Sequence, residues 1–152
     1  MSRHIGVVQF PGTNCEQDSI DTIKNLGGQA EILWHGSDTV GSVEAIVIPG
    51  GFAHGDYLRC GAIARFSPIM TAISRFANSG GVVLGICNGF QVLTETGLLP
   101  GALQKNVGLK FLCQMESLIV DSTSSAIGKS FKSGEQLQIP INHFEGNYVC
   151  SP

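Results

Sequence analysis

The feature that most constrains the fold is a regular alternation of short apolar segments with segments of helical periodicity, between residues 5 and 100. The apolar segments predict strands at residues 5–10, 30–34, 45–48 and 82–84. The periodic segments predict helices at about residues 16–26, from Ser67-Pro68 onward, and from Asn88 to just before Gly97. Parallel strands need crossover connections, and a strand that is apolar on both faces must be covered on both. The predicted fold class is therefore α/β, a doubly wound and mostly parallel sheet flanked by helices.

Capping residues and glycines set the expected limits of these elements. Asn14 is the expected cap of the first helix, and Gly27-Gly28 is its stop signal. After Pro100 the pattern changes, because residues 111–120 and 137–141 suggest strands joined by the polar stretch 121–125 without a helix. We therefore expect a small antiparallel appendage.

The length of 152 residues favours a single domain over residues 1–152. Its last residues stop without a closing helix, so we expect the chain to be incomplete at its carboxyl end. The start, Met1 to His4, resembles no signal peptide, which favours a cytoplasmic location. No apolar run is long enough for a bilayer, and the net charge of −3 without a basic cluster argues against nucleic acid.

Five cysteines without framework spacing are expected to be reduced thiols, and the histidines form no metal-binding pattern. One thiol stands out, because residues 85–89 follow a Gly-x-Cys-x-Gly pattern between a predicted strand and a predicted helix. Cys87 would then be a nucleophile on a tight turn, where the helix amino terminus favours the thiolate. The alternative is a buried thiol that only fills the core.

A second candidate element lies at the end of the preceding strand. The backbone N–H of Gly51 can approach a tetrahedral oxyanion closely, and with the N–H of Asn88 it would form an oxyanion hole. An ordinary Gly-Gly turn is the alternative.

Residues 50–64 closely resemble the glutaminase subunits of phosphoribosylformylglycinamidine synthase, and residues 10–15, 84–91, 97–101 and 139–146 share this resemblance. The resemblance implies a flavodoxin-like class I glutamine amidotransferase. In that family a cysteine, here Cys87, attacks the glutamine amide and releases ammonia through a thioester. Ammonia then serves purine biosynthesis on a separate synthetase subunit, which binds ATP and Mg²⁺, with a small accessory subunit.

No cofactor is expected in this chain itself. Residues 127–130 resemble the end of a phosphate loop, but Thr123 stands where its first glycine should be. In the loop facing the elbow, Arg59 is expected to hold a carboxylate, either that of glutamine or that of Asp56, or else to form a purely structural ion pair. Cys60 in the same loop is not expected to react.

The family also implies a His-Pro-Glu segment near the carboxyl end that supplies the catalytic base and its orienting carboxylate, and this sequence has none. His143 and Glu145 have the right residue types, and on a strand they would share a face. They match a different family motif, with Phe144 in place of a glycine, so the catalytic pair is expected beyond Pro152. His54 is a weaker candidate.

Two other functions remain open from the sequence: a catalytically silent subunit that docks on a synthetase, and a stand-alone cysteine hydrolase of similar fold. The signature at residues 50–64 argues against the hydrolase. An ammonia assay distinguishes the other two.

Overall fold

A computed structural model describes residues 2–151 of the chain, which form two compact units. The first unit comprises the residues up to Leu103 together with those from Tyr148, and the second comprises Gln104–Asn147. The chain thus leaves the first unit once and returns to it near its end.

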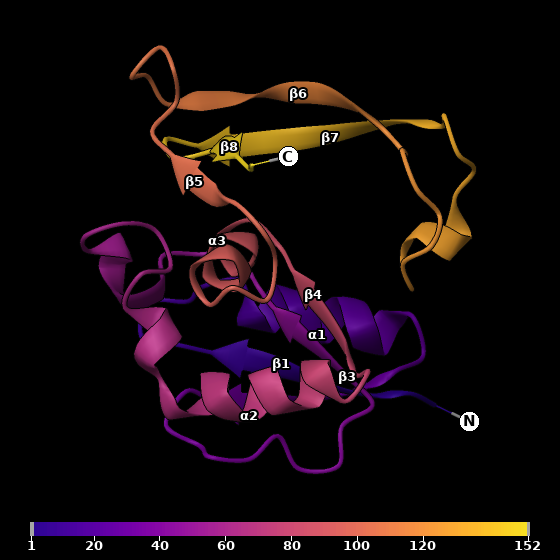
Figure 1. The fold of residues 1–152 in the computed structure, drawn as a ribbon. Coiled ribbons are helices and arrows are strands. Elements are labelled where there is room, and N and C mark those ends of the chain that lie inside the picture. Colours follow the sequence, from indigo (N-terminus) through magenta and orange to yellow (C-terminus); the bar gives the residue numbers. More distant parts are fainter. Residues whose placement is uncertain (1, 152) are drawn as a thin grey trace. The chain divides into compact units, whose positions relative to one another are not determined.

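The first unit is built on a four-stranded parallel sheet (Figure 1). Its strands, in spatial order, are β2 (Gln29–Trp34), β1 (His4–Gln9), β3 (Ala45–Ile48) and β4 (Val82–Gly85). The helices of this unit are α1 (Glu16–Asn25), α2 (Pro68–Asn78) and α3 (Asn88–Glu95). The predicted α/β class and each predicted strand and helix of this region are confirmed, with ends that shift by one residue or two.

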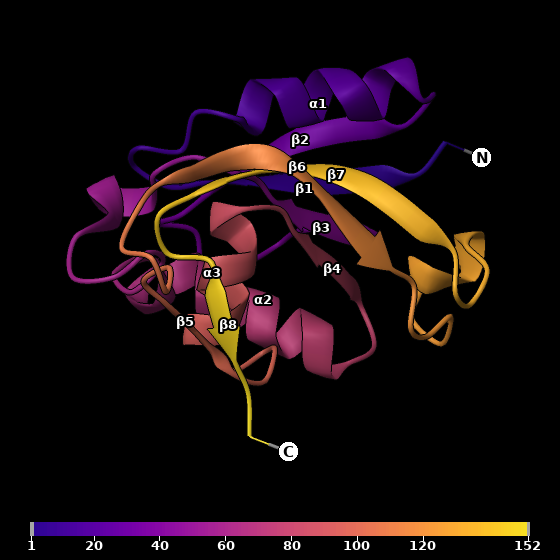
Figure 2. The ribbon, with the colours of Figure 1, turned by 90° about the horizontal axis from the view of Figure 1, so that it is seen from above.

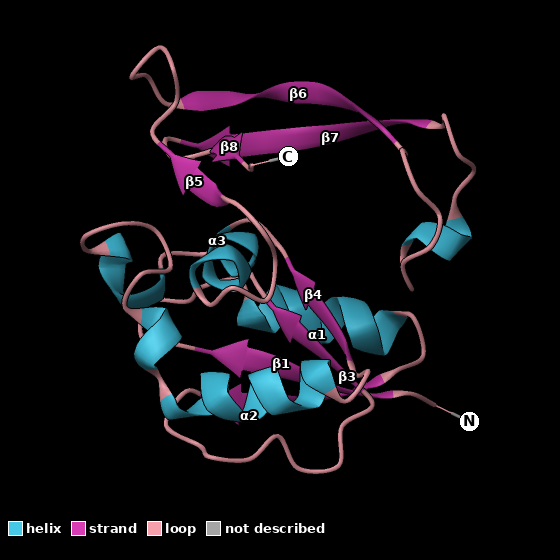
Figure 3. Cartoon of the chain, in the orientation of Figure 1, coloured by secondary structure: helices cyan, strands magenta, loops and turns pink. Residues whose placement is uncertain are grey.

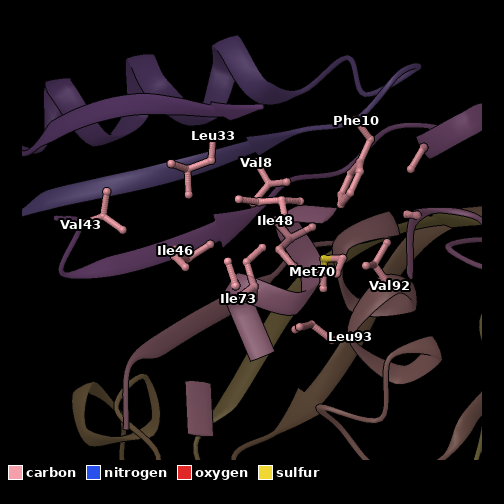
Figure 4. Close-up of a cluster of buried hydrophobic side chains, with 14 residues drawn as sticks. Val8, Phe10, Leu33, Val43, Ile46, Ile48, Met70, Ile73, Val92 and Leu93 are labelled. Atoms are coloured by element: carbon pink, nitrogen blue, oxygen red, sulfur yellow. The ribbon is translucent and has the colours of Figure 1, made fainter. Parts of the chain in front are cut away.

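The helices cover both faces of the sheet, with α1 on one side and α2 and α3 on the other (Figure 2). Neighbouring residues of one strand point to opposite faces, so Val7 packs towards α1 whereas Val8 packs towards α2 and α3. The larger of the two cores lies on the α2 and α3 side, and Figure 4 shows Ile46, Ile48 and Ile73 within it. Burying such a side chain contributes about 1.5–3 kcal/mol, so this core holds α3 firmly against the sheet.

The expected cap of α1 was wrong. Cys15, rather than Asn14, precedes the first helical residue, and no side chain caps this end. Asn14 lies beside Gly51 instead, with its Oδ1 atom 2.6 Å from the place where a Cβ of residue 51 would stand. Thr13 and Gly51 also form an isolated antiparallel bridge, which draws the segment before α1 towards the loop after β3.

In the second unit β6 (Leu112–Ile119) pairs with β7 (Gln136–His143) as an antiparallel ribbon (Figure 3). The register places Leu112 opposite His143 and Ile119 opposite Gln136. A 3-10 turn at Gly128–Ser130 lies in the connection between them. The predicted antiparallel appendage is therefore confirmed. Where the chain passes between the units, β5 (Ala102–Gln104) pairs with β8 (Asn147–Val149).

Candidate active site

Cys87 forms a one-residue turn between β4 and α3. The N–H of Ile86 still donates to the Ile48 carbonyl of the neighbouring strand (3.0 Å), while the N–H of Phe90 already donates to the Cys87 carbonyl (3.0 Å). Cys87 therefore absorbs the whole change of direction, with φ 51° and ψ −110°. Such a conformation is costly for a residue with a Cβ, and it leaves the Cys87 thiol exposed at the amino end of α3.

The two glycines around Cys87 are needed because the helix lies very close to the strands. A Cβ on Gly89 would collide with the carbonyl oxygen of Ile48. A Cβ on Gly85 would lie 2.6 Å from Cδ1 of Leu93 and 2.7 Å from the carbonyl carbon of Gly89. These distances agree with the steric reason that the sequence pattern suggested for the elbow.

The loop after β3 lies against this elbow. We call residues 50–53 the glycine loop. A Cβ on Gly50 would stand 3.3 Å from the Cβ of Cys87, so only a residue without a side chain leaves this room. Gly51 has φ 131°, and a Cβ there would lie 2.8 Å from the backbone nitrogen of Asn14. Both positions thus bring main chain, rather than side chain, next to the thiol.

The side chain of Asn88 joins the elbow to the glycine loop, a role that the sequence did not reveal. Its Oδ1 accepts a hydrogen bond from the N–H of Ala53 (3.0 Å), and its Nδ2 donates to Asp56 (2.9 Å) and to Gln91 (3.0 Å). The side chain is buried, with 3% of the residue exposed. Sequence reasoning considered only the backbone N–H of Asn88, because its partners lie on a loop distant in the chain.

Arg59 forms a bidentate ion pair with Glu95, at the last turn of α3. Its Nε and Nη2 atoms donate to the two carboxylate oxygens at 2.6 and 2.8 Å. The side chain of Glu95 is largely buried, and the hydrogen bond from Arg59 lowers the pKa of the Glu95 carboxyl. Of the roles expected for Arg59, the structural ion pair is the one observed, with a partner that the sequence did not indicate. Asp56 accepts from Asn88 instead.

We expect Glu95→Gln to lower the free energy of unfolding by about 1–2 kcal/mol near neutral pH, since one hydrogen bond to a charged group is weakened. The folded-state pKa of Glu95 is depressed, so its contribution is present above the pKa of the unfolded chain and is lost as the pH falls through the folded value. Urea unfolding of both proteins at neutral and acidic pH measures this. A difference that persists unchanged at acidic pH would contradict the assignment.

A second thiol lies close to the elbow. The Sγ of Cys15 is 3.8 Å from the place of a Cβ on Gly50, the same position that approaches Cys87. Burial raises the pKa of the Cys15 thiol, and Asp18, Cys87 and Glu16 raise it further. Cys15 therefore remains a neutral thiol beside the exposed one.

His54 lies in an aromatic cluster. Its ring centroid is 5.6 Å from that of His35 and 6.1 Å from that of Phe10. Burial lowers the pKa of His54, and His35 lowers it further, so the ring is held neutral. This packing accounts for His54 without a catalytic role.

His143 and Glu145 belong to the second unit, and the premise that they share one strand face was wrong. Strand β7 ends at His143, and Glu145 lies in the bend that follows. The buried Asn106 organises this bend: its Oδ1 contacts Nδ1 of His143 (3.0 Å) and accepts from the N–H of Gly146 (3.1 Å). Its Nδ2 donates to the His143 carbonyl (3.0 Å). The catalytic role of the pair stays a prediction.

Metal-binding clusters and membrane spans are both absent from residues 2–151. Within that part of the chain, no group of three or more His, Cys, Asp or Glu side chains is placed to hold a metal ion. None of its helices combines the length and the hydropathy that a membrane span requires.

The fold and the elbow define an α/β domain with a cysteine nucleophile elbow. The family model of the CobB/CobQ-like glutamine amidotransferase domain matches residues 2–152. Phosphoribosylformylglycinamidine synthase subunit PurQ of Koribacter versatilis is 53% identical over 146 residues, and that of Rhodococcus jostii is 50% identical over 151 residues. The chain belongs to this glutamine amidotransferase family and, within it, to the PurQ subunits.

The matches differ in how much of each relative they cover. The alignments span 95% and 99% of this chain, but only 63% of the Koribacter protein and 67% of the Rhodococcus protein. Among solved structures, PurLQS from Thermotoga maritima matches with a TM-score of 0.94 and 39% identity, over 100% of this chain and 71% of that one. A putative GMP synthase protein from Thermoplasma acidophilum matches at 0.65 and 17% identity over 95% and 66%, which supports the fold alone.

Proposed function

We propose that this chain provides the glutaminase chemistry of phosphoribosylformylglycinamidine synthase in purine biosynthesis, with Cys87 as the nucleophile. The observation that carries the proposal is the exposed thiol of Cys87 at the strained elbow, directly against the glycine loop. The family membership and the PurQ relatives supply the reaction class.

The reaction follows from this geometry. The sulfur of Cys87 bonds to the side-chain carbonyl carbon of glutamine, and the resulting oxyanion is received by the N–H groups of Gly51 and Asn88. The N–H of Asn88 is available for this because the first N–H groups of a helix have no acceptor within it. The C–N bond then breaks, and the amide nitrogen takes a proton and leaves as ammonia. Water hydrolyses the thioester to glutamate and restores the thiol.

The partners of this chain are also part of the proposal. The relatives are named as subunits of a synthase, and the Thermotoga match belongs to the complex PurLQS. We infer that a synthetase subunit receives the ammonia and binds ATP and Mg²⁺, that a small accessory subunit joins the complex, and that the complex works in the cytoplasm. Glutamine is the only small substrate that this chain itself binds.

The proton carrier is the least defined component of the site. A base must take the thiol proton and return one to the leaving nitrogen. Within this chain the candidate pair is His143 and Glu145, and the Nδ1 of His143 is already engaged by Asn106. If the pair acts, Nε2 of His143 is the atom that exchanges the proton.

We expect 6-diazo-5-oxo-L-norleucine, a glutamine-derived diazoketone, to alkylate Cys87 and none of the other four cysteines. The reagent needs both a glutamine site and a reactive thiol, whereas Cys15 is held neutral. Peptide mass spectrometry of the labelled protein, with and without competing glutamine, identifies the modified residue.

Iodoacetamide is the matched control, because Cys113 and Cys150 are exposed like Cys87 but have no glycine loop beside them. It should label all three exposed thiols. A subunit that only docks would leave Cys87 no more reactive to the diazoketone than Cys113, and that result would refute the proposal.

A further inference from the structure

The buried carboxamide of Asn88 connects the nucleophile's helix to the loop that faces the nucleophile. It follows Cys87 directly in the chain, and its Oδ1 holds the N–H of Ala53, two residues after Gly51. Both residues are almost completely buried, Asn88 at 3% exposed and Ala53 at 2%. A single side chain thus sets the spacing between the elbow and the end of the glycine loop.

Asp56 determines which way this carboxamide points. An ionised carboxylate can only accept hydrogen bonds, so the oxygen of Asp56 requires the NH₂ group of Asn88 on its side. Gln91 offers its Oε1 to the same NH₂ group, which fixes the same orientation. The Oδ1 of Asn88 is then left facing Ala53, the one partner in this network that donates to it.

The loop needs such a restraint because its backbone is strained. His54, Asp56 and Leu58 all have positive φ angles, between 53° and 71°. For residues with a Cβ each such conformation costs about 1–2 kcal/mol, so a loop of this shape persists only where other interactions hold it. The hydrogen bonds of Asn88 act at the start of this segment, next to the glycine loop.

We propose that the side chain of Asn88 is a positioning residue for the oxyanion hole, and that Asp56 orients it. Through the N–H of Ala53 the carboxamide keeps the Gly51 N–H at a fixed place relative to the Cys87 sulfur. The inference rests on the proposed function for its catalytic consequence, but not for the geometry itself. The Arg59 ion pair with Glu95 ties the same loop to the far end of α3, away from Cys87, and serves as a comparison.

The first test measures the geometry without any chemistry. In Asn88→Ala we expect the amide hydrogen of Ala53 to exchange about tenfold faster than in the unchanged protein, because one buried hydrogen bond is lost. Glu95→Gln is the control and should leave that amide protected. An exchange rate at Ala53 that Asn88→Ala does not alter would overturn the proposal, whether or not the protein hydrolyses glutamine.

The second test uses the diazoketone, whose ketone oxygen takes the place of the amide oxygen. Asn88→Asp keeps an acceptor for Ala53 but sets a second carboxylate against Asp56. We expect its maximal labelling rate to fall roughly tenfold to a hundredfold, with little change in the concentration for half-maximal rate, because a misplaced donor weakens the transition state.

Exchange of donor and acceptor provides the rescue. The double substitution Asn88→Asp with Asp56→Asn restores one donor and one acceptor across the same gap, so labelling should recover most of the lost rate. A double variant as slow as Asn88→Asp, with an unchanged melting temperature, would contradict the orienting role of Asp56. If the unchanged protein is not labelled at all, the proposed function fails, and the exchange at Ala53 still decides the positioning claim.

Discussion

Replacing Cys87 with alanine is expected to abolish glutamine hydrolysis while leaving the fold intact. The sulfur is the atom that bonds to the substrate in the proposed reaction, and no other described thiol lies on a strand-to-helix elbow. Loss of a catalytic nucleophile costs on the order of a thousandfold or more in rate. The measurement is ammonia release from glutamine by the protein assembled with its synthetase subunit.

The stability of the same variants distinguishes a functional residue from a structural one. Cys87 is exposed and strained, so Cys87→Ala should change the free energy of unfolding by no more than about 0.5 kcal/mol. Cys87→Gly, which relieves the positive φ angle, should be at least as stable as the alanine variant. Cys113→Ala is the exposed control and should keep full activity. Ammonia release that survives in Cys87→Ala would show that another group is the nucleophile.

The largest expected effect on stability is that of Gly89→Ala. Alanine is the better helix former by about 1 kcal/mol, and Gly89 lies in α3, so propensity alone predicts a gain. The added Cβ would collide with the Ile48 carbonyl, which belongs to a central strand and cannot move aside cheaply. The collision outweighs the propensity, and we expect a net loss of roughly 3 kcal/mol.

A control in the same unit separates collision from backbone conformation. Gly80 has φ 93° but open space around the place of a Cβ, so Gly80→Ala carries strain without a clash. It should lose about 1 kcal/mol, clearly less than Gly89→Ala. Urea unfolding of both variants gives the comparison. Equal losses in the two variants would mean that close helix-to-strand contact is not what fixes glycine at residue 89.

The sequence predicted the framework well because the signals are local. Each strand of the parallel sheet is a short apolar run, and turns such as Gly27-Gly28 mark where the helices end. The steric need for glycine at residues 85 and 89 could also be predicted, since it follows from the turn itself.

The contacts that arrange the loop could not be predicted, since they join residues far apart in the chain. Nothing in the residues around Asn88 indicates that its side chain meets Ala53, and nothing around Arg59 indicates Glu95. Asn14 was expected to cap α1 because local rules favour it, yet tertiary contact with the glycine loop competes for it. Such choices depend on packing that exists only once the sheet has formed.

The parallel sheet also separates two edges with different tolerance to change. Every loop that contributes to the candidate site leaves the carboxyl end of a strand, whereas the return turns at Gly27 and Gly80 lie at the amino ends. Both glycines have open space around them. A fluorophore or surface anchor introduced at these turns would therefore report on the domain, or immobilise it, without obstructing the thiol at the opposite edge.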